Sequence, residues 1–265
     1  MANVLFSYAI SPYVAKVRAI LRYKQVPFRE QTVHPLRRGE VKRLSGQLLV
    51  PIMDFDGKVV ADSTAIAQAI EERFPVPSLL PEDPAQRGMV KLLEEWADEG
   101  LATVVQPLRW LIPYNFRATQ QRMRASYPPG RADDLTVAAV ARAVQLKMIR
   151  KYGFGRPALM LNRFAEVMDY LDAVLKPTGF LVGDKPTIAD FAVYGFLSQL
   201  EELDGWETLR ARRRVAKLLK TLGGGGEEKE KPQAKAPAPA PRAESYDAHD
   251  QALIDASRLR RAKVK

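Results

Sequence analysis

The sequence predicts two consecutive domains, an α/β domain followed by an all-α domain. Residues 1–75 alternate between strand-like and helix-like patterns, whereas residues 85–222 show helical patterns and no convincing strand. The proline-rich stretch 76–84 separates the two halves and is expected to be a linker. The 265 residues, of which 46% are apolar, suffice for one large domain or two ordinary ones.

The first half is predicted to follow the order strand, helix, strand, helix, strand, strand, helix. Short runs of β-type residues mark the strands, and Asp56-Gly57 marks a turn between the last two. Pro12 begins a helix with an apolar face, and Asp62 or Ser63 caps the last helix. The expected strands are 4–6, 28–33, 50–54 and one that begins at 59, with a short basic helix over 36–44.

The second half is predicted to consist of helices. Apolar side chains from Met89 to Ile112 recur at helical spacing, so we expect one long helix that bends at Pro107. Residues 115–131 are polar and basic and end near a Pro-Pro-Gly sequence, so we expect a loop there. Further helices are expected over 132–151, 157–176, 187–203 and 206–222.

The last part of the chain, residues 223–265, differs in composition from the rest. Its four initial glycines indicate a flexible hinge. The proline- and alanine-rich stretch that follows is typical of disordered or polyproline-like chain. Residues 245–265 could form a short amphipathic helix with a basic end.

The composition excludes several kinds of chemistry. Because there is no cysteine, the chain has no disulfide, thiolate zinc site or cysteine nucleophile, and any redox thiol must come with a ligand. The two histidines, His34 and His249, are far apart, which argues against a Ser-His-Asp triad and against a metal site, so we expect no metal. The sequence contains no run of 18 apolar residues, so we expect no transmembrane segment. The N-terminus shows no signal-peptide pattern, so we expect a cytoplasmic protein.

The net charge of +10 comes from 41 basic and 31 acidic residues. Basic clusters at 37–38, 42–43, 122–131 and 210–214 could attract an acidic ligand or nucleic acid. No nucleic-acid-binding motif accompanies them, so a solvated basic surface is the preferred interpretation. A nucleic-acid accessory role is the least favoured of the functions considered below.

The first candidate for function is Ser11-Pro12-Tyr13, at a predicted strand-to-helix turn. A polar side chain directly before a helix lies at the positive end of the helix dipole, which stabilises an anion such as a thiolate. Ser11 could donate a hydrogen bond to a bound thiolate, but without a nearby histidine it is a poor nucleophile. The alternative is that Ser11 only caps the helix.

Two further segments carry candidate binding residues. Val50-Pro51 stands at the start of a predicted strand, and if this bond is cis, the Val50 backbone is exposed to pair with a peptide-like ligand. The alternative is an ordinary trans proline. Asp62-Ser63 precedes a predicted helix, where the first N–H groups could hold a carboxylate and Asp62 could hold an ammonium group. Here too the alternative is a simple helix cap.

In this order and spacing, the three segments resemble the thioredoxin-like N-terminal domain of the glutathione transferase superfamily. The serine–proline–tyrosine segment is similar to the Cys-Pro-Tyr/Phe element of glutaredoxins and omega-class transferases, with serine in place of cysteine. The valine–proline pair resembles the family's cis-proline, and the aspartate–serine pair resembles its γ-glutamyl-binding residues. Residues 183–190 resemble the family's capping-box segment, in which Thr187 and Asp190 bond reciprocally.

Residues 34–42 narrow the resemblance to the prostaglandin E synthase type 2 branch of the family. That branch bears a Cys-Pro-Phe-Cys pair, and Ser11 and Val14 stand in its two cysteine positions here. Thiol-dependent isomerase chemistry is therefore not carried over to this chain.

The resemblance covers about residues 1–222 and implies an α/β thioredoxin-like domain followed by an all-α helical domain, with glutathione bound between them. It implies that the backbone of glutathione pairs at Val50 beside Pro51 and that its γ-glutamyl group meets Asp62 and Ser63. The thiol would lie near Ser11, with three rivals for this role: Tyr13, Tyr8 and Ser7.

The resemblance also implies a glutathione-dependent transferase, in which the thiolate attacks a small electrophile. The electrophile pocket would draw on four aromatic residues, for which packing is the alternative role: Tyr13, Trp110, Tyr114 and Phe116. Glutathione would be a co-substrate, and the family usually forms homodimers. The alternative function is a non-catalytic binding or regulatory protein on the same fold.

Overall fold

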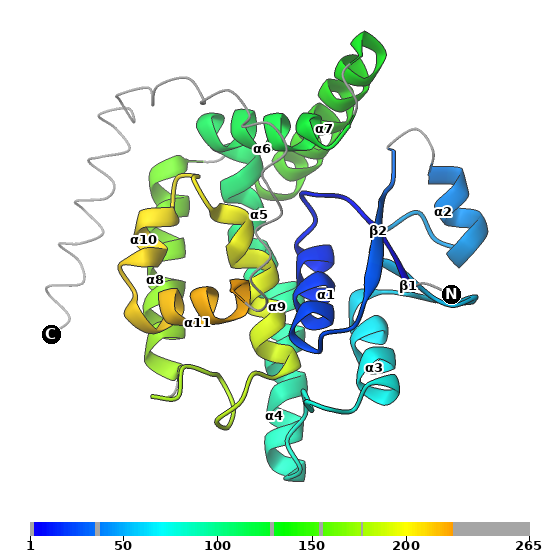
Figure 1. The fold of residues 1–265 in the computed structure, drawn as a ribbon. Coiled ribbons are helices and arrows are strands. Elements are labelled where there is room, and N and C mark those ends of the chain that lie inside the picture. Colours follow the sequence, from blue (N-terminus) through cyan, green and yellow to red (C-terminus); the bar gives the residue numbers. More distant parts are fainter. Residues whose placement is uncertain (1–2, 35–37, 128–129, 154–155, 176, 225–265) are drawn as a thin grey trace, which may run out of the picture.

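The computed structural model describes residues 3–34, 38–127, 130–153, 156–175 and 177–224 (Figure 1). The stretch 225–265, which includes the expected basic helix at 245–265, lies outside the described residues.

The N-terminal part is a four-stranded mixed sheet in the order β2-β1-β3-β4. β1 pairs with β2 in parallel, and the β1–β3 and β3–β4 pairs are antiparallel. The elements are β1 Asn3–Ser7, α1 Pro12–Tyr23, β2 Phe28–Thr32, α2 Arg38–Ser45, β3 Ile52–Phe55, β4 Lys58–Ala61 and α3 Ser63–Arg73. This is the order of strands and helices that the sequence predicts.

Helices cover both faces of this sheet, with α2 on one side and α1 and α3 on the other (Figure 1). The alternation of side chains along β1 explains these two layers. Val4 and Phe6 pack with Val41 of α2, whereas Leu5 belongs to the larger core that includes Val17 of α1. The packing of β1 against helices on both faces therefore fixes the position of the loop that leads from β1 to α1.

The C-terminal part is helical. Its elements are α4 Pro84–Glu95, a π-helix Trp96–Leu101, α5 Ala102–Leu111, α6 Pro113–Ala125, α7 Arg131–Tyr152, α8 Pro157–Val174, α9 Ile188–Leu197, a 3-10 turn Ser198–Leu200, α10 Trp206–Arg210 and α11 Arg213–Gly223. A thioredoxin-like α/β domain followed by a helical domain is therefore the fold of this chain.

Several details of this half differ from the sequence predictions. The expected loop at 115–131 is wrong over its first part, because α6 begins at Pro113 and buries a narrow stripe of small and polar side chains that hydrophobic periodicity does not reveal: Asn115, Ala118, Thr119 and Met123. The long helix is interrupted by the π-helix rather than at Pro107, which lies inside α5. The helices expected at 187–203 and 206–222 end or divide at the 3-10 turn and at Ala211-Arg212.

The two parts meet where α9 packs directly on α1. Gly195 permits this contact, because a Cβ at this position would lie 2.5 Å from the carbonyl oxygen of Pro12. At the start of α9, Asp190 is buried and accepts hydrogen bonds at 2.8 Å from the backbone N–H and the hydroxyl of Thr187. This confirms the predicted capping box and fixes the helix that supports the start of α1.

Candidate functional site

The turn between β1 and α1 is closed by its own backbone. The N–H of Ser11 donates to the carbonyl oxygen of Tyr8 at 3.1 Å. Ser11 is the N-cap of α1, and its Oγ accepts from the N–H of Val14 at 3.3 Å. Because a hydroxyl can donate while it accepts, the capping role leaves the Ser11 proton available for an anion at the helix N-terminus.

A cleft of about 430 Å³ lies between this end of α1, the loop before β3, the start of α3 and the π-helix. It brings together Tyr13 with the four residues that the sequence singled out for glutathione binding, which are Val50, Pro51, Asp62 and Ser63. The Val50–Pro51 peptide bond is cis, and the pairing between β1 and β3 begins only at Ile52. Ser11 lies two residues before Tyr13 and is not among the residues that line this cleft.

The start of α3, which lines the cleft, is capped by Asp62. Asp62 has a positive φ of 82° and accepts from the N–H groups of Thr64 and Ala65 at 2.9 and 3.1 Å. Ser63 is buried at 4% exposure beside it. Asp62 is therefore both a helix cap and a carboxylate at the edge of the cleft.

The remaining charges of the cleft are negative. Glu95, Asp98 and Glu99 line the cleft together with Asp62. Glu95 ends α4, and Asp98 and Glu99 lie on the π-helix that follows, a kind of turn that is frequent at functional sites. The cleft thus favours a cationic group, such as an ammonium, near its acidic wall.

A buried lysine lies behind this wall. The Nζ of Lys16 is 2.7 Å from Glu94 and 2.7 Å from Asp98, and the hydroxyl of Thr64 donates to Glu94 at 3.0 Å. Burial raises the pKa of Asp98, against the opposing effect of Lys16. The sequence analysis missed this cluster because its members lie on α1, α3 and the α4–π-helix segment, and the only available signal was a lysine on the apolar face of α1.

Tyr13 is poorly suited to activate a thiol. Its hydroxyl donates to the carbonyl oxygen of Asp98 at 3.1 Å, and its ring packs edge-on against Phe196. Burial, followed by the nearby carboxylates of Asp98 and Glu99, raises the pKa of Tyr13 to about 12. Of the other rivals, Ser7 is 1% exposed within β1. Ser11, the N-cap of α1, has neither of these features.

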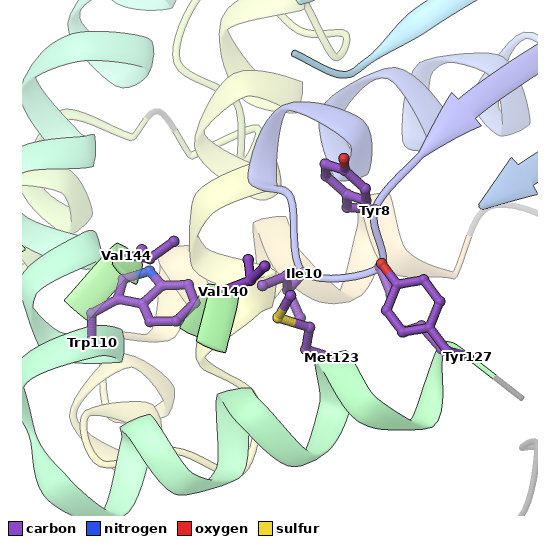
Figure 2. A pocket seen from close by; sticks show the side chains of 9 residues that line it. Tyr8, Ile10, Trp110, Met123, Tyr127, Val140 and Val144 are labelled. Carbon is purple, nitrogen blue, oxygen red and sulfur yellow. The ribbon is translucent and has the colours of Figure 1, made fainter. Parts of the chain in front are cut away.

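A second, smaller pocket of about 100 Å³ lies on the other side of the β1–α1 turn. Figure 2 shows Ile10 from the turn beside Met123 and Val140, with Trp110 and Val144 at one end of the pocket. The lining is mainly apolar, with two tyrosines at one end (Figure 2). Because the turn passes from this pocket to the cleft within a few residues, Ser11 stands between the two.

The four aromatic residues proposed for an electrophile pocket are not brought into one place. Trp110 lines the second pocket, whereas Tyr13 lines the cleft. Phe116 packs behind Trp110, with ring centroids 6.3 Å apart. Tyr114 lies elsewhere, with its hydroxyl 3.5 Å from the carbonyl oxygen of Glu202. The sequence did not single out Ile10, Met123 or the α7 side chains, because only the fold brings them to Trp110.

Within the described part of the chain, no group of three or more His, Asp or Glu side chains is arranged to hold a metal ion. None of the described helices is both long and apolar enough to cross a bilayer.

A thioredoxin-like domain with a cis-proline cleft that faces a helical domain defines the class of glutathione transferases. The family models for the N-terminal and C-terminal domains of glutathione S-transferase match residues 5–81 and 94–220, respectively. The chain belongs to the glutathione transferase superfamily.

Curated relatives within this family differ in the activity that they are named for. Maleylacetoacetate isomerase of Rattus norvegicus is 30% identical over 112 residues, which cover 40% of this chain and 50% of the relative. Protein LigF of Sphingobium sp. is 30% identical over 129 residues, with 46% and 49% covered. Prostaglandin E synthase 2 of Mus musculus is 24% identical over 258 residues, with 80% and 67% covered. The chain thus spans about half the length of the first two relatives.

Solved structures agree on the fold. A glutathione S-transferase from Rhodospirillum rubrum has a TM-score of 0.60 at 20% identity, covering 91% of this chain and 96% of that one. The β-etherase LigF from Sphingobium sp. has a TM-score of 0.57 at 21% identity, covering 84% and 96%.

Proposed function

We propose that this protein binds glutathione in the cleft and conjugates its thiolate to a small electrophile. The observation that carries the proposal is the cleft itself, in which the cis Val50–Pro51 segment and the start of α3 lie opposite the first turn of α1. An extended tripeptide has a backbone for the free edge at Val50 and a carboxylate for the N-terminus of α3.

The charges of the cleft support one orientation of glutathione. Its γ-glutamyl carboxylate would accept hydrogen bonds from the N–H and hydroxyl of Ser63 at the N-terminus of α3. Its ammonium group would lie against the acidic wall that includes Asp62 and Glu99. The cysteinyl backbone would pair with Val50, which directs the sulfur toward the N-terminus of α1.

Ser11 is proposed to hold the sulfur as a thiolate. The Ser11 hydroxyl would donate to it, and the N-terminal dipole of α1 would lower its pKa from about 8.5. The thiolate then forms a carbon–sulfur bond, and the electron pair of the broken bond leaves with the departing group or moves into the acceptor. This step requires no acid or base from the protein.

The electrophile is proposed to enter from the pocket that Trp110 lines, on the opposite side of Ser11. Its small volume and mainly apolar lining fit a compact, uncharged group such as a single aromatic ring. The relatives named for isomerase and β-etherase activity make a maleyl compound and an aryl ether the natural probes beside an aryl halide.

We propose a homodimer, as is usual in the family. Met89, Leu92 and Trp96 form an exposed apolar stripe along α4 and the start of the π-helix, at 49%, 68% and 38% exposure. These residues are spaced three and four apart and lie on one helix face. An exposed stripe of this kind is typical of a contact surface.

Calorimetric titration of reduced glutathione tests the binding step. We expect saturable binding that Ser63→Ala weakens about tenfold, because a hydrogen bond to a carboxylate is lost. Ser198→Ala is the matched control, since its hydroxyl bonds the carbonyl of Gly195 on α9. No binding at millimolar glutathione would contradict the proposal.

Turnover separates the enzyme from a binding protein on the same fold. Ser11→Ala should leave glutathione affinity nearly unchanged and lower conjugation of a chlorodinitrobenzene at least tenfold, because the thiolate loses its donor. Binding without turnover of any of the three probes would favour the alternative, a non-catalytic regulatory protein.

A further inference from the structure

Arg109 is a buried cation directly behind the β1–α1 turn. The residue is 2% exposed, and its Nη2 donates to the carbonyl oxygen of Ile10 at 2.9 Å. Ile10 is the residue immediately before Ser11, so the guanidinium lies one peptide unit behind the N-cap of α1. The sequence gives no reason to single it out beyond an arginine on the buried face of α5.

Besides the Ile10 carbonyl, this guanidinium has the ring of Trp110 as a neighbour, with the ring centroid 6.0 Å from its Cζ, but it lacks the carboxylate that a buried arginine normally has. Its Nε is buried and has no hydrogen-bond partner, and among the described residues it forms no ion pair with a carboxylate. The charged group near it is a second guanidinium, that of Arg122. Burial, with Arg122 adding to it, lowers the pKa of Arg109 to about 9. A buried charge without a counterion destabilises a fold, so its retention needs a reason outside stability.

The site in front of the turn supplies that reason. A thiolate near Ser11 would meet an unfavourable field from the cleft, because the charged groups around Tyr13 are the carboxylates of Asp62, Asp98 and Glu99. Lys16 does not offset this negative field, because its charge is neutralised by Glu94 and Asp98. The positive charge that faces the turn from behind is that of Arg109.

We propose that Arg109 is a positioning residue that stabilises the thiolate of bound glutathione through the β1–α1 turn, as its missing counterion. The inference rests on the proposed function. The hydrogen bond from the guanidinium to the Ile10 carbonyl fixes the turn and therefore Ser11. The electric field of the guanidinium reaches the sulfur through a region of low dielectric constant. No atom of Arg109 needs to touch glutathione.

The test is the absorbance of the glutathione thiolate in complex with the protein, followed against pH. Arg109→Gln keeps an amide donor, on a side chain two atoms shorter, but removes the charge, so it should raise the pKa of the bound thiol by about one unit. Arg122→Gln is the matched control. Its guanidinium already bonds the carbonyl of Gln199 and lies 3.9 Å from the carboxylate of Glu202, so the thiol pKa should stay unchanged.

Stability gives the second readout. Arg109→Gln and Arg109→Met should both fold, because the charge that they remove is uncompensated. Wild-type protein that binds no glutathione overturns the proposed function and this inference together. A lowered thiol pKa in the wild type that Arg109→Gln leaves unchanged overturns the inference alone. Failure of both variants to fold also overturns it, because Arg109 would then be a structural group.

Discussion

Two buried cations flank the start of α1, and they differ in how their charge is balanced. Lys16 contacts two carboxylates, each at 2.7 Å, and so ties α1 to the helical part of the molecule. Arg109 contacts a backbone carbonyl and no carboxylate among the described residues. The first charge is neutralised inside the protein, whereas the second has no carboxylate partner among the described residues, which is the basis of the role proposed for Arg109.

The largest predicted difference follows from this comparison. Lys16→Met leaves Glu94 and Asp98 buried without a cation, so it should lower the free energy of unfolding by about 3–5 kcal/mol. Arg109→Met removes an uncompensated charge and should change the free energy by no more than about 1 kcal/mol. Urea unfolding at neutral pH measures the free energy of unfolding of both variants. Equal losses of stability in the two variants would contradict the difference in charge balance between Lys16 and Arg109.

The contact between α9 and α1, the helix that carries Lys16, predicts a smaller effect on the free energy of unfolding. A Cβ at position 195 would lie 3.1 Å from the backbone N of Lys16 as well as against Pro12, so Gly195→Ala should destabilise the protein by about 2 kcal/mol. The control is Gly88→Ala on α4, where nothing lies within 4 Å of the added methyl group. Thermal unfolding should show the control unchanged or slightly stabilised, and a neutral Gly195→Ala would mean that the two helices are free to separate.

The cap of α3 predicts the next effect. Asp62→Ala removes the acceptor for two N–H groups and places alanine at a positive φ, so we expect a loss of about 1–2 kcal/mol. Asp62→Asn keeps an acceptor and tolerates this backbone conformation, so it should lose less than about 0.5 kcal/mol. Calorimetry on Asp62→Asn then isolates the charge, and unchanged glutathione affinity would remove Asp62 from the ammonium site.

Tyr13 predicts the smallest effect, visible only at alkaline pH. The folded protein holds the Tyr13 proton to about pH 12, whereas the unfolded chain releases it near 10.0. The unfolded state thus binds fewer protons in this window, and stability must fall as the pH rises through it. The advantage of wild type over Tyr13→Phe in urea unfolding should shrink between about pH 10 and about pH 12. A constant difference would show that the phenol is not perturbed.

Much of the fold is predictable from the sequence because local patterns determine it. The strands of the sheet, the cap at Asp62 and the Thr187–Asp190 capping box depend on residues within a few positions of one another. Helix α6 was not predictable in this way, since its buried face consists of residues such as Asn115 and Thr119 that are common in loops. Only packing against α5 and α7 makes that face the inner one.

The candidate site likewise has a part that is predictable from local sequence and a part that is not. The segments at Ser11, Val50 and Asp62 are short motifs, so the sequence alone could nominate them. The groups that set their electrostatics are distant in sequence, since Lys16 meets Asp98 and Arg109 meets Ile10 only through the packing of α1 against the helical part. The aromatic residues expected in one electrophile pocket could not be placed from the sequence either, because Tyr114 and Trp110 are four residues apart but lie in different places.

A crystal structure of the complex with reduced glutathione tests the account most directly. We predict the γ-glutamyl carboxylate at the N–H and hydroxyl of Ser63, the cysteinyl backbone paired with Val50, and the sulfur within hydrogen-bond distance of the Oγ of Ser11. A sulfur atom beside the hydroxyl of Tyr13, or a tripeptide bound outside this cleft, would contradict it.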